Sequence, residues 1–128
     1  MTPGRSMPLQ KILVVDDSPT ERFFLANLLS KQGYTVVTAE NGEEAIAKIR
    51  SERPSLVVMD VVMPGRSGFQ VTRALTRDPE TQAIPVILCT SKATETDRIW
   101  GLRQGARDYV IKPVNAEELL AKIADLVH

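Results

Sequence analysis

The chain has 128 residues, with 16 basic and 16 acidic side chains and a formal net charge of zero. A chain of this length forms one domain and buries roughly two thirds of the surface that its unfolded form exposes. Because neither charge sign forms a long block, binding to nucleic acid or to an anionic membrane is not indicated, and the expected partner is a protein.

Residues 1–10 hold two prolines and a glycine without periodicity, so we expect a flexible lead before a domain at 11–128. The first five residues of that domain are largely apolar and predict a buried strand. A helix follows, in which Ser18 is the expected N-cap and Glu21 completes a capping box. The helix ends near Gly33, and its expected apolar stripe consists of Phe24, Leu25, Leu28 and Leu29.

Strands and helices continue to alternate along the rest of the chain. The expected elements are a strand at 35–38, a helix from Asn41 to before Pro54, a strand at 56–59, a helix from Ser67 to before Asp78, a strand at 85–89, a weaker helix at 94–104, a strand at 108–111 and a helix from Asn115 to Val127. This pattern predicts right-handed βαβ crossovers and a doubly wound, flavodoxin-like α/β sandwich of three layers, with five parallel strands and five helices. The strand order 2-1-3-4-5 is preferred because it makes the first and third strands neighbours.

Two further properties indicate the cellular compartment of the protein. The single cysteine, Cys89, lies inside an apolar run, so we expect a small buried side chain in a reducing compartment. No stretch approaches the roughly 18 apolar residues that span a bilayer, and the N-terminus lacks the pattern of a secretory signal. We therefore expect a cytoplasmic monomer without membrane insertion.

Polar side chains follow four of the predicted strands. Asp16 and Asp17 follow the first strand, Asp60 ends the third, and Thr90 and Lys112 end the fourth and fifth. The carboxyl ends of parallel strands meet at one edge of a sheet, about 4.8 Å apart, so these groups should converge. At an effective dielectric constant near 20, each pair of carboxylates there repels by about 3 kcal/mol. Such a cluster requires a cation, and Mg²⁺ suits oxygen ligands that leave room for water and phosphate.

The same groups are those that phosphoryl transfer requires. Lys112 can neutralise one phosphoryl oxygen, while Thr90 and the loop amides after Asp60 take the others. Asp60 is then left as the nucleophile that forms an aspartyl phosphate. The only histidine, His128, stands at the chain terminus, where we expect it to be solvated. The phosphoryl group should therefore come from another protein.

These motifs together resemble the receiver domains of two-component response regulators. The residues that carry the resemblance are Asp16-Asp17, Asp60 with Met63-Pro64-Gly65 and Gly68, Thr90-Ser91, Gly105-Ala106, Tyr109 and Lys112-Pro113. Within this family the chain is most similar to the stand-alone chemotaxis-type receivers of type IV pilus (twitching-motility) systems, the PilH kind. That narrower similarity rests on Glu95-Thr96-Asp97, Trp100-Gly101 and the segment 103–109.

The resemblance implies a phosphoacceptor and a metal site. Asp60 would receive a phosphoryl group from a chemotaxis-type histidine kinase. Asp17, Asp60 and the Val62 carbonyl would be direct ligands of Mg²⁺, and Asp16 would act through water. The chain would be a signalling protein rather than an enzyme, with only self-catalysed phosphotransfer and autodephosphorylation of its own.

The resemblance also implies a switch and a special peptide bond. Thr90 and Tyr109 would form the switch pair, and the Lys112–Pro113 bond would be cis. The output would be docking to a protein target, in chemotaxis-like or type IV pilus motility control, because the last predicted helix ends the chain and leaves no room for an output domain.

The stretch 94–104 is expected to be the least stable helix. It holds several poor helix formers, among them Gly101, which costs about 1 kcal/mol relative to alanine in a helix interior. Ile99 and Leu102 mark its apolar stripe, and Trp100 is offset from them. We expect this helix, the fifth strand and the last helix to form the docking face, with Trp100 and Tyr109 as aromatic anchors.

Two other classes of protein fit these residues less well. A haloacid-dehalogenase-type phosphatase needs an acid two residues after its nucleophile, where this chain has Val62. A flavodoxin holds phosphate in a Ser/Thr/Gly-rich loop after the first strand, where Asp16 and Asp17 would repel it without a metal. A phosphate sink that drains a shared kinase, or a phosphorylation-independent binding module, remains open.

Overall fold

The computed structural model describes residues 10–91 and 95–127. The elements in chain order are β1 (Lys11–Val15), α1 (Pro19–Lys31), β2 (Thr35–Ala39), α2 (Gly42–Glu52), β3 (Leu56–Asp60), α3 (Gly68–Arg77), β4 (Val86–Thr90), α4 (Glu95–Arg103), β5 (Asp108–Ile111) and α5 (Ala116–Leu126). The expected flexible lead, except for Gln10, lies outside the described residues, as do Thr94 and His128.

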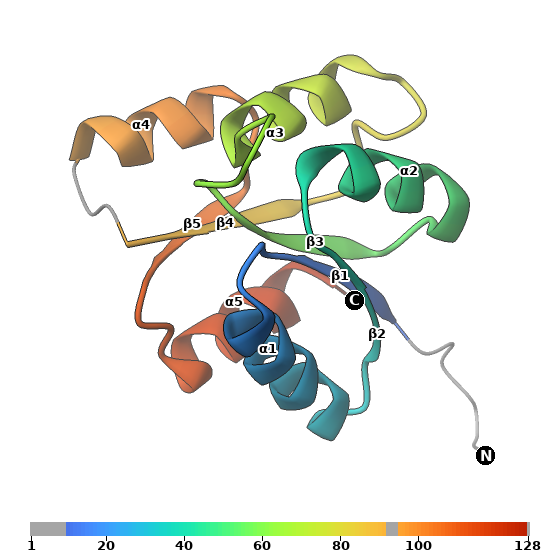
Figure 1. Ribbon diagram of the computed structural model, residues 1–128, viewed down its shortest axis with the longest axis vertical. Helices are drawn as coiled ribbons and strands as arrows, with labels where there is room; N and C mark the ends of the chain where they lie inside the picture. Colours follow the sequence, from blue (N-terminus) through green and yellow to red (C-terminus); the bar gives the residue numbers. More distant parts are fainter. Residues whose placement is uncertain (1–9, 92–94, 128) are drawn as a thin grey trace.

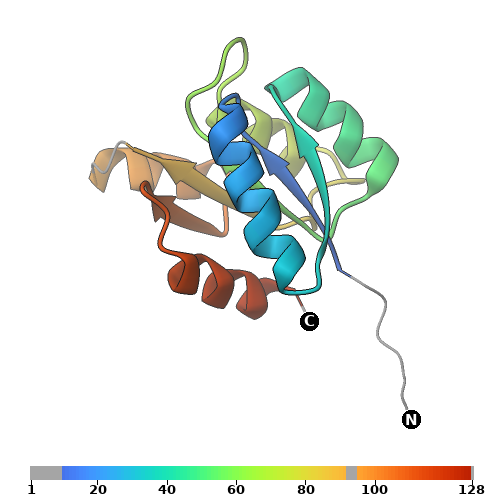
Figure 2. The same cartoon turned by 60° about the horizontal axis from the view of Figure 1, so that its bottom comes forward.

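All five strands are parallel and lie in the order β2-β1-β3-β4-β5, which confirms the predicted fold and strand order. Helices α1 and α5 cover one face of the sheet, and α2, α3 and α4 cover the other (Figures 1 and 2). Val15 of β1 lies opposite Met59 of β3, so the residues after β1 are beside the end of β3. The order therefore brings Asp16 and Asp60 to one edge of the sheet.

The sheet separates two apolar cores. Strands β3 and β4 are buried at every position, which explains why their apolar runs do not alternate. One core packs α1 and α5 against the sheet through Leu25, Leu29, Leu119 and Ile123. The other packs α2 and α3 through Ala45, Ile49, Val71 and Leu75. Cys89 lies in the first core, as expected.

The predicted capping box is present at the start of α3 but not at the start of α1. Ser67 and Gln70 form the predicted reciprocal capping box. Ser18 does cap α1, since its hydroxyl accepts a hydrogen bond from the Glu21 amide. The predicted capping box at Ser18 is wrong, however, because the Glu21 carboxylate accepts a hydrogen bond from Lys112 instead. The Ser18 amide donates to the Asp16 carboxylate, so the start of α1 is tied to the end of the sheet.

Two predicted apolar stripes are only partly buried. On α1, Leu25 and Leu29 are buried, whereas Phe24 is 50% exposed and does not belong to the core. On α4, Ile99 is 42% exposed and Leu102 is 37% exposed, so the predicted stripe of that helix is wrong. Gly101 is the residue that α4 buries, and a Cβ there would stand 3.1 Å from side-chain atoms of Leu88 and Phe69. The helix approaches the sheet closely because this position has no side chain.

Candidate phosphoacceptor site

Three carboxylates meet at the carboxyl edge of the sheet. One oxygen from each of Asp16, Asp17 and Asp60 lies within 4.8 Å of the others. Asp16 and Asp60 are buried, and Asp17 is exposed. Asp17 and Asp60 border an open hollow of about 500 Å³ that is also lined by Glu21, Val62, Ser91, Lys112 and Pro113. The convergence that was predicted for the ends of β1, β3 and β5 is therefore confirmed.

Lys112 is the cation of this cluster. Its Nζ lies 2.8 Å from Glu21 Oε2, 3.0 Å from Asp16 Oδ2 and 3.5 Å from Asp60 Oδ2. Burial alone would lower the pKa of Lys112, but its hydrogen bonds to Glu21 and Asp16 and the charge of Asp60 outweigh burial and raise that pKa. The ammonium is therefore protonated at neutral pH. The Lys112–Pro113 peptide bond that follows it is cis, as the resemblance implied.

Glu21 is a residue of this site that the sequence analysis assigned elsewhere. It stands in the first turn of α1, four positions after Asp17, and its carboxylate reaches Lys112 across the hollow. The helix that follows the Asp16-Asp17 pair starts at the same edge of the sheet, so an acid in its first turn was a signal for this position. Only the placement of β5 could show that a lysine faces it.

The Asp60 carboxylate is held on both oxygens. The Val62 amide donates a hydrogen bond to Oδ1 at 3.3 Å, and Lys112 lies beside Oδ2. Burial raises the pKa of Asp60, and Asp16 raises it further, while Lys112 and the Val62 amide lower it; the balance is a raised pKa. Asp60 is thus a buried carboxylate whose charged form is disfavoured by burial and by the charge of Asp16.

The ligand atoms available here suit Mg²⁺. They are carboxylate oxygens, which a hard divalent cation prefers, and the hollow leaves space for water molecules and a phosphate group. Among the described residues, Lys112 is the one side chain that forms ion pairs with this cluster of three carboxylates. Asp16, Asp17 and Asp60 therefore fit the metal that the sequence predicted, and Val62 lines the same hollow.

Thr90 and Tyr109 lie next to each other behind this site. Thr90 ends β4 and is buried, and Tyr109 on β5 is 7% exposed. Burial raises the pKa of the Tyr109 hydroxyl, as does the charge of Asp97, while a side-chain hydrogen bond with Thr90 lowers it. The two residues of the predicted switch pair are in contact. In this conformation Tyr109 is turned inward, so of the two predicted anchors only Trp100, which is 49% exposed, lies at the surface.

The parallel sheet and the acidic edge around Asp60 agree with a known family. The family described as "Response regulator receiver domain" matches residues 12–124, so the chain belongs to the receiver domains of two-component signalling. Receiver domains are signalling domains rather than a classical enzyme family. Membership implies a histidine kinase as partner and acidic residues that bind Mg²⁺.

Three comparisons place the chain within the family. Protein PilH of Pseudomonas aeruginosa is 56% identical over 115 residues, which cover 90% of this chain and 95% of PilH. The probable transcriptional regulator ycf27 of Pyropia yezoensis is 45% identical over 118 residues, but the chain spans only 47% of that relative's length. The crystallised chemotaxis protein CheY4 of Vibrio cholerae superposes with a TM-score of 0.88 at 31% identity, covering 94% of this chain and all of that one. Among the described residues, no helix has the length and apolar character that crossing a membrane requires.

Proposed function

We propose that this receiver domain accepts a phosphoryl group on Asp60 from a histidine kinase in a Mg²⁺-dependent reaction and then docks to a protein target. The observation that carries the proposal is the Lys112 ammonium 3.5 Å from Asp60 Oδ2, inside a cluster of three carboxylates. The similarity to PilH supports a role in type IV pilus or chemotaxis-like motility control.

The transfer exchanges one phosphorus bond for another. An Asp60 carboxylate oxygen attacks the phosphorus of a phosphohistidine, the new O–P bond forms, and the P–N bond breaks. The imidazole nitrogen leaves with the electron pair and takes up a proton from solvent. Asp17, Asp60 and the Val62 carbonyl would hold Mg²⁺ directly and Asp16 would hold it through water; the bound metal would supply positive charge for the phosphoryl oxygens.

Two side chains of the protein stabilise the charge on the phosphoryl oxygens. Lys112, which already faces Asp60, donates to a phosphoryl oxygen and neutralises the charge that the new group brings. The Thr90 hydroxyl, at the end of the neighbouring strand, donates to another phosphoryl oxygen. In autodephosphorylation a water oxygen attacks the phosphorus, the bond to Asp60 breaks, and the carboxylate and inorganic phosphate are restored.

The signal would pass from Thr90 to the surface of α4. Movement of Thr90 toward the phosphoryl group removes its hydrogen bond to Tyr109, which can then change its position. Tyr109 packs under Gly101, the buried residue of α4, with a distance of 3.5 Å between the Tyr109 ring and a Cβ built at that glycine. A helix with so little buried surface has a low cost of rearrangement, which makes it the element that phosphorylation would move. The face of α4, β5 and α5 would then bind the target through Trp100 and, after the switch, Tyr109.

The test is phosphotransfer from a radiolabelled, phosphorylated histidine kinase, with Asp60→Asn as the control and with EDTA in a parallel reaction. We expect label on the wild-type chain in Mg²⁺, none on Asp60→Asn, and none in EDTA. Label on Asp60→Asn would assign the phosphoacceptor to another residue. If the label were transferred but the phosphorylated chain bound no target, the role of a phosphate sink would be favoured. If Asp60→Asn retained function in cells, a phosphorylation-independent binding module would be favoured.

A further inference from the structure

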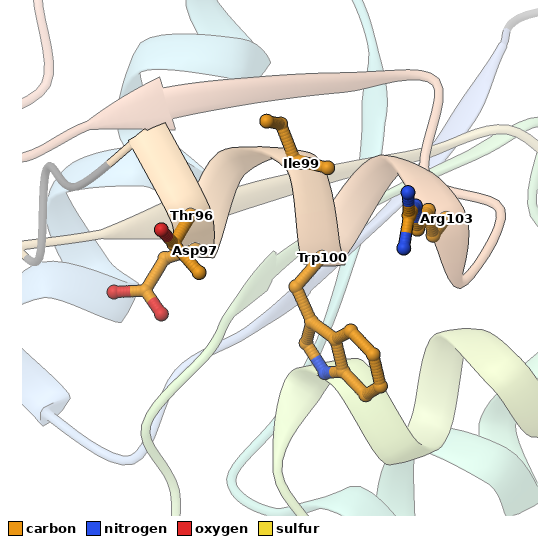
Figure 3. A pocket seen from close by; sticks show the side chains of 5 residues that line it. All are labelled: Thr96, Asp97, Ile99, Trp100 and Arg103. Atoms are coloured by element: carbon orange, nitrogen blue, oxygen red, sulfur yellow. The ribbon is translucent and has the colours of Figure 1, made fainter.

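A basic groove lies between α3 and α4, away from the phosphoacceptor site. It is a hollow of about 320 Å³ lined by Arg73, Thr76, Arg77, Trp100, Arg103 and Gln104. The Thr76 hydroxyl donates a hydrogen bond to the Gln104 carbonyl at 2.9 Å, which joins α3 to the residue that follows α4. Figure 3 shows the Trp100 indole extending away from α4, with Arg103 on the following turn of that helix.

The three arginines of this groove have no carboxylate partner within the part of the chain that the structure describes. Five other arginines of the same part do have one, namely Arg22 with Glu40, Arg50 with Asp78, Arg53 with Glu80, Arg66 with Glu43 and Arg98 with Glu95, whereas Arg107 has none. The chain as a whole carries no net charge. A local excess of three guanidinium groups on one groove is therefore a feature of this surface and not of the overall composition.

The helices by themselves do not account for the placement of all three charges. Arg73 and Arg77 stand four residues apart on α3, where like charges destabilise a helix. Arg77 and Arg103 lie in the last turns of α3 and α4, and there a positive charge is favoured by the helix dipole. The dipole accounts for those two charges but not for Arg73 or for the convergence of all three. An anion in the groove would account for the whole set.

A second hollow adjoins the groove and shares two of its residues. It measures about 230 Å³ and is lined by Thr96, Asp97, Ile99, Trp100 and Arg103 (Figure 3). Trp100 and Arg103 line both hollows, and the exposed side chains of Ile99 and Trp100 give the second hollow an apolar wall. A ligand that complements both would carry negative charge against the arginines, away from the Asp97 carboxylate of the second hollow, and an apolar group against Ile99 and Trp100.

We propose that the groove between α3 and α4 binds an acidic peptide segment of a protein partner. Its carboxylates would pair with Arg73, Arg77 and Arg103, whose planar guanidinium groups match carboxylates with two parallel hydrogen bonds. A neighbouring aromatic or aliphatic side chain would lie against Ile99 and Trp100. Arginine and tryptophan are the residues that most often carry the binding energy of protein interfaces. A small phosphate compound would use the arginines but leave the apolar wall uncovered, which favours the peptide.

The inference deepens the docking role of the proposed function, on which it rests, but it does not require phosphorylation. It also extends the docking surface to α3, which the expected face of α4, β5 and α5 does not include. Binding through the groove can therefore be measured on the unphosphorylated chain, and phosphotransfer to Asp60 can be measured on variants of the groove.

The experiment begins with selection of a random peptide library, displayed on phage, against the unphosphorylated full chain. We expect the selected peptides to be rich in Asp and Glu, with an aromatic or aliphatic residue beside the acids. A selected peptide is then synthesised and titrated into the protein, and the fluorescence of Trp100, the only tryptophan, reports binding at the shared wall.

Variants test the residues that we assign. Arg73→Gln/Arg77→Gln and, separately, Arg103→Gln should each weaken the binding of the selected peptide by about tenfold or more, since hydrogen bonds between charged groups are lost. The matched control Arg50→Gln/Arg66→Gln removes the same charge as the double variant on α2 and the loop before α3, and it should change the affinity by less than about twofold. Circular dichroism melting confirms that each variant is folded.

Defined outcomes would overturn the inference. They are selected peptides without an excess of acids, equal loss of affinity in the control variant, or binding of pyrophosphate or guanosine monophosphate that is tighter than that of the peptide. Phosphotransfer to Asp60 should be unchanged in Arg73→Gln/Arg77→Gln. If phosphotransfer succeeds and no acidic peptide is selected, only the inference fails. If an acidic peptide binds and phosphotransfer to the wild type fails, only the proposed phosphoacceptor function fails.

Discussion

Replacing Asp60 by asparagine is expected to stabilise the metal-free protein while it removes the phosphoacceptor. Asparagine has nearly the same shape and can still accept the hydrogen bond of the Val62 amide, so the substitution removes mainly the charge. That charge lies in a site where Asp16 and Asp60 are both buried and where Lys112 is shared among three carboxylates. The change in the free energy of unfolding therefore measures the electrostatic repulsion that the Asp60 charge causes in the folded protein.

The distances set the size of the effect. Lys112 Nζ at 3.5 Å from Asp60 Oδ2 attracts the carboxylate by about 5 kcal/mol at an effective dielectric constant near 20. Carboxylate oxygens of Asp16 and Asp17 within 4.8 Å of Asp60 each repel it by about 3.5 kcal/mol or more. Repulsion thus exceeds attraction by about 2 kcal/mol, and the desolvation of Asp60 adds to it. Because Asp17 is exposed and screened by solvent, we expect a gain on the order of 1–2 kcal/mol in the free energy of unfolding.

The assay is urea and thermal unfolding in EDTA, followed by circular dichroism. A gain of this size corresponds to a rise in the melting temperature of roughly 4–10 °C for a domain of this length. Asp125→Asn is the matched control, because Asp125 is exposed at the far end of α5 and its charge contacts no cation in the described residues. Adding Mg²⁺ should stabilise the wild type more than Asp60→Asn, since the variant loses one of the ligand carboxylates.

The pH dependence gives a second check with a definite sign. Because burial and Asp16 raise the pKa of Asp60, the folded protein binds this proton more readily than the unfolded chain does. The wild type therefore loses stability relative to Asp60→Asn as the pH rises from the ordinary aspartate pKa through the raised one. The advantage of the variant should be full at neutral pH and should vanish in acid. An Asp60→Asn protein that unfolds at lower urea concentration than the wild type in EDTA at neutral pH would refute the reasoning.

Four further predictions follow from individual residues. Asp17→Ala should also raise stability in EDTA and abolish phosphotransfer from the kinase; a lower unfolding midpoint without metal would contradict it. Gly68→Ala should destabilise the domain by about 2 kcal/mol or more, because a Cβ there would collide with the Asp60 carbonyl oxygen; a variant that melts like the wild type would show that α3 can shift. Burial raises the pKa of the Cys89 thiol to about 12. Ellman's reagent should therefore react with Cys89 at mildly alkaline pH only after the protein unfolds, and rapid reaction with the folded protein would show that the thiol is not buried. Among the helices, α4 should show the fastest amide hydrogen exchange, and its exchange should slow most when a phosphoryl mimic and Mg²⁺ are added. Equal exchange in both states would argue against α4 as the moving element.

Local patterns in the chain were enough to predict the architecture and the central carboxylates. Strands β1, β3 and β4 are apolar on both faces. A polar group follows β1 and ends β3 and β4, so the residues that lie at the edge of the sheet could be named from order alone. The strand order was chosen to bring Asp16 and Asp60 together, and the observed register does so. Helix caps such as Ser67 with Gln70 were predictable because their hydrogen bonds join residues three apart.

The tertiary structure alone decided features that depend on which elements become neighbours. A capping box and an ion pair compete for Glu21. The ion pair with Lys112, which follows the distant strand β5, prevails because only the fold brings that lysine to 2.8 Å from the Glu21 carboxylate. Apolar periodicity could not show that α4 faces the sheet with Gly101, since the close approach is allowed by the absence of a side chain and leaves Ile99 and Leu102 partly exposed. Arg73, Arg77 and Arg103 belong to two helices that are separated by β4, and their convergence on one groove follows from the packing of α3 beside α4. Periodicity reports which side of a helix is apolar, whereas contacts between elements depend on distances that only the folded chain sets.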